Sequence, residues 1–284
     1  MRPLRIGRIA FTNVLPIYHY FEADGLPVEL VPMVPSQLNR LMAAGEVDMG
    51  PISSFAYAEQ YPNYVLLPDL SVSARGRVGS IFLFTRDADL SDLRSAKIAL
   101  TNTSASSVAL LKVLLNGFEG GNPEYITLPP SLGEMMEQAD AALLIGDDAI
   151  RAQWENPGYR VLDMGWEWYQ RTGLDMVFAV WAVRREVVKE RPDELYAVYE
   201  RFFASKERSR LDPIPVIREA QRQLGGDEAF WRKYYNGLCY DLRQPQLEGL
   251  EAYYRRAAEI GLLSPNVRIE MLDLPAGTSM GEPR

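Results

Sequence analysis

The sequence predicts an α/β protein made of two lobes with a cleft between them. Short apolar segments alternate with helix-forming segments along the first 150 residues, and this order favours parallel strands joined by right-handed crossovers. Two longer apolar segments, 78–85 and 176–183, bracket the middle of the chain, as expected if the chain leaves one lobe and later returns to it. Its 284 residues are enough for two such lobes.

The first lobe is expected to begin with a strand, a turn and a short helix. Residues 4–9 alternate apolar and polar side chains, which is typical of a strand. Thr12 and Asn13 mark a turn, and Pro16 suits the first turn of a helix that ends near Phe21. Asn13 therefore follows directly after the end of a strand.

A strand–helix–strand unit follows. Residues 28–34 form the expected strand, Ser36 can cap a helix that Gly45 ends, and residues 47–52 form the next strand. The remaining strands expected in this part of the chain are 64–67, 70–74 and 78–85.

The middle of the chain repeats the order of strand, polar loop and helix. Its expected strands are 97–100 and 141–145, each followed by a helical segment. After strand 176–183 the pattern changes to helices with Pro or Asp at their starts, namely 192–207, 213–224, 227–236 and 245–260. The tail from Ser264 has no regular pattern. We expect a first lobe that includes residues 1–84, a second lobe of residues 85–180, and a mostly helical return to the first lobe over residues 181–284.

Composition excludes several classes of function. Thirty Lys and Arg against 38 Asp and Glu give a net charge of −8, which argues against broad binding of nucleic acid or anionic lipid. A single cysteine, Cys239, and a single histidine, His19, exclude an internal disulfide and a cysteine- or histidine-rich metal centre. We expect no export segment, because Arg8 interrupts the apolar residues that follow Arg2 and Arg5, and no apolar window approaches the roughly 20 residues needed to cross a bilayer. We expect a cytoplasmic protein with a small-molecule partner and with no metal or cofactor.

Polar side chains follow the predicted strands at the ends that face the cleft, where α/β proteins bind ligands. The loop 103–107 is rich in hydroxyls and precedes a helix, so it could bind a carboxylate or phosphate, although ordinary N-capping is the alternative. The candidate site residues are Asn13, Ser53, Ser54, Ser80, Thr103, Ser104, Ser106, Ser107, Gly146 and Asp147.

Each candidate also has a structural interpretation. Asn13 can bond its own backbone in a turn, and Ser80, inside an apolar strand, can satisfy a backbone carbonyl. Asp147 can supply a base beside the cleft, but its place at a helix start favours a capping role. His19 in a short helix is more typical of a structural residue than of a catalytic one, and Cys239 is expected to pack as a small apolar residue.

Several short segments occur together in a distinctive order. They are Ile6–Ile9 with Phe11, Asn13–Pro16, Val34–Ser36 with Leu38-Asn39, Gly50–Ser54, Leu67–Leu70, Val78–Ser80, Leu100-Thr101 with Thr103-Ser104, Ser106–Val108 with Leu110-Leu111, and Leu143–Ala149. This set resembles the MqnA family, the chorismate dehydratases of the futalosine route to menaquinone. The resemblance covers residues 6 to about 184, and the helical remainder matches mainly in layout.

The resemblance implies a two-lobed fold like that of type II periplasmic solute-binding proteins, used as a cytoplasmic lyase that removes water from chorismate. It assigns binding roles to Asn13, Ser80, the serine pair 53–54 and the loop 103–107. Thr12 and Val14 replace the Leu and Cys expected around the motif asparagine, whereas Asn13 itself is retained.

Asn13 and Ser80 are the expected catalytic residues. Neither is a good base near neutral pH, so we expect them to position a weak proton acceptor while the loop 103–107 holds a carboxylate. The related naphthoate synthase opens with a Ser-Pro-Cys-Pro-Asn-Asp-like turn, which residues 11–16 do not contain. A non-catalytic solute-binding protein for a small carboxylate, and that synthase, are the alternatives.

Overall fold

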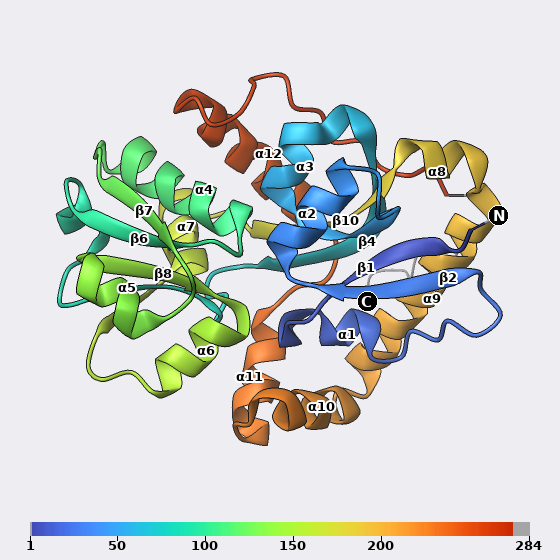
Figure 1. The fold of residues 1–284 in the computed structure, drawn as a ribbon, viewed down its shortest axis with the longest axis horizontal. Coiled ribbons are helices and arrows are strands. Elements are labelled where there is room, and N and C mark those ends of the chain that lie inside the picture. The colour runs from blue at the N-terminus through green and yellow to red at the C-terminus, as the bar shows by residue number, and fades with distance from the viewer. Residues whose placement is uncertain (1, 275–284) are drawn as a thin grey trace.

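A computed structural model describes residues 2–274, which form two lobes lying side by side, each around a five-stranded mixed sheet (Figure 1). The strands are β1 (Leu4–Ile9), β2 (Val28–Met33), β3 (Met49–Ser53), β4 (Tyr64–Ala74), β5 (Ile81–Thr85), β6 (Lys97–Thr101), β7 (Glu124–Leu128), β8 (Ala141–Ile145), β9 (Arg160–Asp163) and β10 (Met176–Arg184). The first sheet has the order β2-β1-β3-β10-β4, and the second has the order β7-β6-β8-β5-β9.

Helices cover both sheets and the junction between the lobes. They are α1 (Leu15–Tyr18), α2 (Pro35–Ala43), α3 (Ser54–Gln60), α4 (Ala105–Lys112), α5 (Leu132–Gln138), α6 (Gly146–Trp154), α7 (Met164–Thr172), α8 (Arg185–Glu190), α9 (Pro192–Leu211), α10 (Ile214–Leu224), α11 (Glu228–Gly237) and α12 (Gln244–Glu259). Short 3-10 helices occupy η1 (Thr12–Val14), η2 (Tyr61–Asn63) and η3 (Leu90–Leu93), and η4 (Val113–Phe118) is a π-helix that continues α4.

The predicted α/β class and the two lobes are confirmed, but pairing is only partly parallel. β1 runs parallel to β2 and β3, and β6 runs parallel to β7 and β8. β10 and β5 are antiparallel to their neighbours. β5 and β10 begin at the cleft, because the chain has just crossed from the other lobe, whereas β3, β6 and β8 end there. β5 and β10 therefore run opposite to the strands that they pair with.

The chain passes from the first sheet to the second between Ala74 and Ile81, and it returns between Asp163 and Met176. The expected first boundary, at residue 84, falls inside β5 of the second sheet. The division of the chain into lobe segments 1–84, 85–180 and 181–284 stays a prediction.

Several local features differ from the expectation. Ser80 precedes β5 instead of lying inside a strand, and residues 64–74 form one strand that bends at Asp69, whose φ is +58°. Five elements were not predicted from the sequence, namely β7, β9, α5, α7 and α8. β7 and β9 are edge strands of the second sheet with partly exposed side chains, so they lack the continuous apolar pattern of a central strand.

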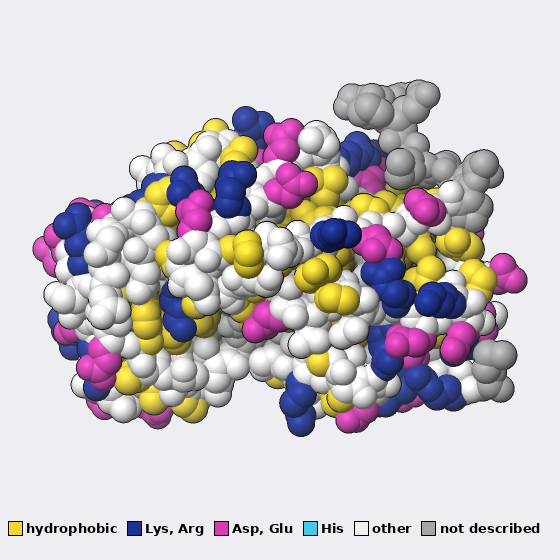
Figure 2. Space-filling view, turned by 90° about the horizontal axis from the view of Figure 1, so that it is seen from above, with side chains coloured by type: hydrophobic (Ala, Val, Ile, Leu, Met, Phe, Trp, Pro, Cys, Tyr) yellow, Lys and Arg dark blue, Asp and Glu magenta, His cyan; other side chains and the backbone are white. Residues whose placement is uncertain are grey.

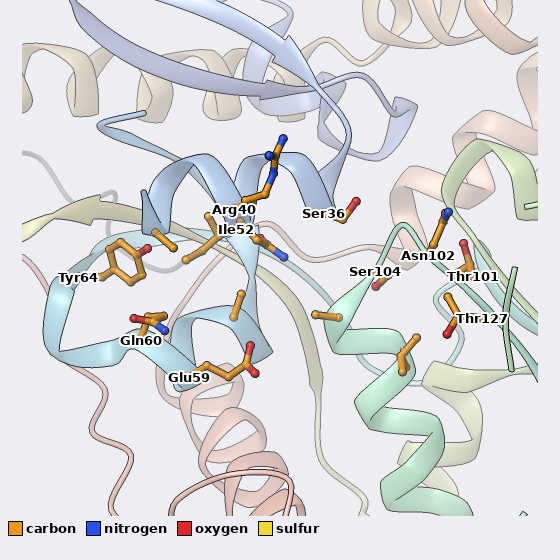
Figure 3. A pocket seen from close by; sticks show the side chains of 15 residues that line it. Ser36, Arg40, Ile52, Glu59, Gln60, Tyr64, Thr101, Asn102, Ser104 and Thr127 are labelled. Atoms are coloured by element: carbon orange, nitrogen blue, oxygen red, sulfur yellow. The ribbon is translucent and has the colours of Figure 1, made fainter. Parts of the chain in front are cut away.

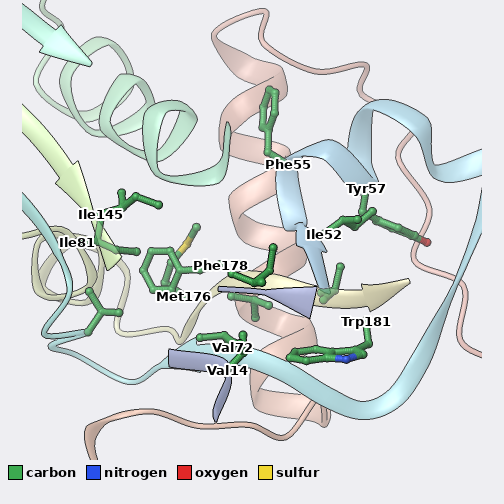
Figure 4. Packing of buried hydrophobic residues seen from close by; sticks show 14 of the residues in the cluster. Val14, Ile52, Phe55, Tyr57, Val72, Ile81, Ile145, Met176, Phe178 and Trp181 are labelled. Carbon is green, nitrogen blue, oxygen red and sulfur yellow. The ribbon is translucent and has the colours of Figure 1, made fainter. Parts of the chain in front are cut away.

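The apolar core continues from one lobe into the other. Ile81 and Ile145 of the second sheet lie beside Phe178 of β10 at the junction (Figure 4), and all three belong to one buried cluster. Trp181 of the same strand is fully buried. The two lobes therefore share part of one apolar core.

Figure 2 shows Lys and Arg side chains interspersed with Asp and Glu over the face seen from above, without a broad patch of one sign. Of the tail, Glu270 and Leu272 hydrogen-bond to the backbone of Leu66, and residues 275–284 lie outside the described part. Among the residues that the structure describes, no helix is both long and apolar enough to span a membrane.

Candidate functional site

The Asn13 turn lies where β1 reaches the cleft. Tyr240 Oη donates a hydrogen bond of 2.8 Å to the Asn13 carbonyl oxygen, and Tyr235 Oη donates one of 3.0 Å to that of Thr12. The side-chain oxygen Oδ1 of Asn13 is buried and has no hydrogen-bond partner among the described residues. A buried amide oxygen without a partner is costly, so it marks a point at which a ligand can donate a hydrogen bond.

Ser80 lies at the corresponding place in the second lobe, directly before β5. It is 2% exposed, and its hydroxyl oxygen accepts a hydrogen bond of 2.9 Å from Tyr234 Oη. Its carbonyl oxygen accepts one of 2.7 Å from the Gly146 amide. The same short stretch of α11 therefore holds Ser80 through Tyr234 and the Asn13 turn through Tyr235.

Gly146 and Asp147 join the lobes. The Asp147 carboxylate accepts hydrogen bonds from the Thr12 amide at 3.0 Å and from the Thr12 hydroxyl at 2.6 Å. Burial raises the pKa of Asp147 above its ordinary value, although the Thr12 hydrogen bonds oppose this shift. Asp147 lies in the first turn of α6, as the helix dipole favours, but it makes no capping hydrogen bond, because its carboxylate turns to Thr12 of the other lobe.

Ser53, Ser54 and Ser106 form a hydroxyl cluster between α3 and α4. Ser106 Oγ lies 2.8 Å from Ser53 Oγ and 2.9 Å from Ser54 Oγ. Ser54 donates to the Val177 carbonyl and Ser106 to that of Phe178. Because each hydroxyl has one hydrogen, these serines have little donor capacity left, and they hold the lobes together. Their contact with a substrate stays a prediction.

The loop before α4 opens onto a cavity of about 470 Å³ between the lobes. Ser104 Oγ caps α4 by accepting from the Ser107 amide at 3.2 Å, and it donates to Ser107 Oγ at 3.0 Å. Thr103 Oγ1 lies 2.8 Å from Thr101 Oγ1. Ordinary N-capping of α4 by Ser104 is thus present. Ligand binding by the same loop stays a prediction.

Figure 3 shows how this cavity is lined. Ser104, Asn102, Thr101 and Thr127 of the second lobe face the segment of the first lobe that carries Ser36, Arg40, Ile52, Glu59, Gln60 and Tyr64. Burial raises the pKa of the Glu59 carboxyl above its ordinary value. The cavity is lined by both polar and apolar side chains and lies at the ends of β3 and β6, as ligand sites of α/β folds do.

His19 and Cys239 lie outside this set. His19 ends α1 and packs edge-on against Tyr20, with ring centroids 4.6 Å apart. Burial lowers the pKa of its imidazole, and Arg208 acts in the same direction. Cys239 pairs through its backbone with Ser73 of β4. Among the described residues no group of three or more His, Cys, Asp or Glu side chains could hold a metal ion.

Sequence reasoning missed the three tyrosines that hold the site, namely Tyr234, Tyr235 and Tyr240. They lie some 150 residues or more from the groups that they contact. The only local signal is a tyrosine-rich stretch in and after α11, which is also what an amphipathic helix facing a core would contain.

The close approach of the lobes gives a testable result at Gly146. Its φ is +60°, and a Cβ there would come within 2.8 Å of the Phe11 ring. We expect Gly146→Ala to lower the free energy of unfolding by about 2 kcal/mol, measured by urea denaturation, because left-handed backbone costs roughly 1–2 kcal/mol and the ring contact adds to it. Gly25→Ala is the matched control, since Gly25 has φ +78° and no atom within 4 Å of that position. Equal losses in both variants would contradict the close contact.

The family model described as Menaquinone biosynthesis matches residues 4–259. A Thermus thermophilus protein named chorismate dehydratase is 37% identical in an alignment 269 positions long, which covers 89% of this chain and 94% of the relative. A second T. thermophilus protein, named 1,4-dihydroxy-6-naphtoate synthase, is 24% identical in an alignment 278 positions long, which covers 94% of this chain and 98% of the relative.

Solved structures show the same architecture. The periplasmic aliphatic sulphonate binding protein SsuA from Escherichia coli superimposes with a TM-score of 0.68 at 16% identity, covering 100% of this chain and 97% of that one. The predicted fold of the periplasmic binding protein type is thereby confirmed. At this level of identity the likeness extends to the fold alone.

Proposed function

Because the chain belongs to the menaquinone biosynthesis family, we propose that it is a hydro-lyase that converts chorismate to 3-[(1-carboxyvinyl)oxy]benzoate and water. The observation that carries this proposal is the 37% identity, along 89% of the chain, to a protein named chorismate dehydratase. The match to the protein named as a synthase is weaker, at 24%. The proposal includes a cytoplasmic location, as expected of an enzyme that makes a biosynthetic intermediate.

Much of the driving force of this dehydration comes from the substrate, because its ring becomes aromatic. The proton at C3 of chorismate is vinylogous to the ring carboxylate, so its removal gives a dienolate, and loss of the C4 hydroxyl then makes the ring aromatic. Over the two steps, the C3 proton and the C4 hydroxyl are lost as one water. The site has to orient the ring, stabilise charge on the carboxylate and place a proton acceptor near C3.

Asn13 and Ser80 are suited to orientation and not to proton abstraction. An amide is not a base at neutral pH, and an unassisted serine hydroxyl is a poor one. We assign both to hydrogen-bonding an acceptor that the substrate itself carries, the enolpyruvyl carboxylate. The Asn13 amide can donate to that carboxylate through Nδ2, while its Oδ1 accepts from the substrate hydroxyl.

The second carboxylate of chorismate is assigned to the cavity beside α4. Ser104 and Thr103 lie at the start of this helix, where backbone amides and the helix dipole favour an anion. This local potential offsets the net charge of −8. In this proposal the interlobe bonds of Asp147 and of Ser106 hold the lobes closed around the ring and exclude water.

The direct test is incubation of the purified protein with chorismate. We expect stoichiometric conversion. The ultraviolet absorbance of the aromatic product monitors the reaction, and mass spectrometry should show a loss of 18 mass units, the mass of one water. Solute-binding proteins share the fold, so the alternative outcome is binding without change. Recovery of bound but unaltered chorismate would overturn the lyase and favour a receptor for a small carboxylate.

A further inference from the structure

Three tyrosine hydroxyls from one short stretch of chain bond to Ser80, to Asn13 and to Thr12, which precedes Asn13. Tyr234 Oη bonds to the Ser80 hydroxyl, Tyr235 Oη to the Thr12 carbonyl and Tyr240 Oη to the Asn13 carbonyl, at 2.9, 3.0 and 2.8 Å. Two of these bonds hold backbone. Only Tyr234 contacts a side chain of the proposed catalytic pair.

The direction of the Tyr234 bond limits what Ser80 can do. The geometry makes Tyr234 Oη the donor and Ser80 Oγ the acceptor. A phenol keeps its proton at neutral pH, and burial raises the pKa of Tyr234 further. Because Ser80 accepts from Tyr234, its own hydrogen is free to point elsewhere. A hydroxyl that accepts one hydrogen bond is polarised into a better donor of the next.

The ring of Tyr234 is held firmly enough to fix this direction. It lies parallel to Phe230 with an interplanar angle of 8°, and it packs edge-on against Trp231 with ring centroids 5.6 Å apart. A Cβ on Gly79, next to Ser80, would come within 3.2 Å of the Tyr234 ring. Gly79 thus lets the ring pack directly against the backbone that carries Ser80.

The segment around Tyr240 is hydrogen-bonded to β4 and to α9. The amide of Ser71 in β4 donates to the Tyr240 carbonyl, and the Ser73 and Cys239 backbones bond to each other in both directions. The next residue, Asp241, accepts a hydrogen bond of 2.6 Å from Lys206 Nζ. The tyrosines therefore connect the Asn13 turn and Ser80 to the rigid first sheet and to α11.

We propose that Tyr234 is a positioning residue that orients the Ser80 hydroxyl as a hydrogen-bond donor to a substrate oxygen. This inference rests on the proposed function and adds a role that Ser80 cannot fill by itself. No proton passes between Tyr234 and Ser80. The phenol stays protonated throughout, and Ser80 donates a hydrogen bond to the substrate without giving up its hydrogen.

The test is a double-mutant cycle of Tyr234→Phe and Ser80→Ala, read as kcat and KM for chorismate. We expect Tyr234→Phe to lower kcat roughly 3- to 10-fold with little change in KM, the effect of one neutral hydrogen bond. In the Ser80→Ala background the same substitution should have almost no effect, because the hydroxyl that Tyr234 orients is already absent.

Tyr57→Phe is the matched control. Tyr57 is fully buried, and its hydroxyl donates a hydrogen bond of 3.0 Å to the Arg268 carbonyl and accepts one of 3.0 Å from the Glu270 amide, both outside the site. We expect kcat to stay unchanged in this variant, while its melting temperature falls at least as much as that of Tyr234→Phe, because two hydrogen bonds are lost instead of one. A kcat within twofold of wild type in Tyr234→Phe, or an equal loss with and without Ser80, would overturn the proposal.

The two proposals fail in different ways. If the wild type turns chorismate over but the cycle shows no coupling, only the role of Tyr234 is wrong. If the wild type binds chorismate without turnover, the lyase is wrong, and the same four proteins then give the coupling from their dissociation constants. Coupling in Kd supports the orientation of Ser80, and independent effects on Kd overturn it.

Discussion

Asn13→Ala should lower kcat for chorismate about 100- to 1000-fold, the effect of removing one donor aimed at developing charge. Asn13 Oδ1 is buried without a partner in the described part of the chain, so truncation removes no hydrogen bond of the folded protein from this atom. The loss should therefore appear in catalysis and not in the melting temperature. Steady-state kinetics and thermal unfolding of the same preparation check both halves of this expectation.

Asn63→Ala is a suitable control, because Asn63 is exposed and its amide bonds only to the neighbouring Gln60 side chain. We expect normal kcat there. Asn13→Asp keeps the shape but removes the amide donor and adds a charge near the substrate carboxylate, so it should not restore activity. Turnover near the wild-type rate in either Asn13 variant would remove Asn13 from the mechanism.

The strand ends of this fold could be predicted because the information is local. Asn13 and Gly146 follow short strands and Ser53 ends one, and the rule that such ends face a ligand cleft in α/β proteins places them on the two sides of that cleft. The structure brings these segments together through Thr12 and Asp147 and through Ser53 and Ser106. Edge strand β7, half-exposed and five residues long, carries no comparable pattern.

Contacts between distant segments could not be predicted. Tyr234 is 154 residues from Ser80 along the chain, and no periodicity relates a helical tyrosine to a serine in another lobe. The contact of Asp147 could not be predicted for a different reason. Its place at a helix start is already explained by the helix dipole, so nothing local indicates a second partner. Its bond to Thr12 depends on how closely the lobes approach, which is a property of the whole fold.

The support behind the site contains a buried charge network. Lys206 of α9 and Asp69 of β4 are both under 5% exposed, and Lys206 Nζ donates to the Asp69 carbonyl oxygen at 2.8 Å and to Asp241 Oδ1 at 2.6 Å. Arg243 binds the Asp69 carboxylate through two hydrogen bonds. Burial by itself would raise the pKa of Asp69, but the Arg243 hydrogen bond and the nearby positive charges hold it below its ordinary value.

Lys206→Met should lower the free energy of unfolding by about 3 kcal/mol at neutral pH, near the lower end for breaking a buried pair because Arg243 still compensates Asp69. A carboxyl whose pKa is lowered by folding stabilises the fold at pH values above its pKa in the unfolded chain, which is 3.8 for Asp. This contribution is lost as the pH falls through the pKa of the folded state. The difference between variant and wild type should therefore shrink below about pH 4, when both are unfolded in urea. Lys189→Met, at an exposed position in α8, should change stability by less than about 0.5 kcal/mol. A loss in Lys206→Met that is equally small, or that does not depend on pH, would mean that the network does not stabilise the segment carrying Tyr240.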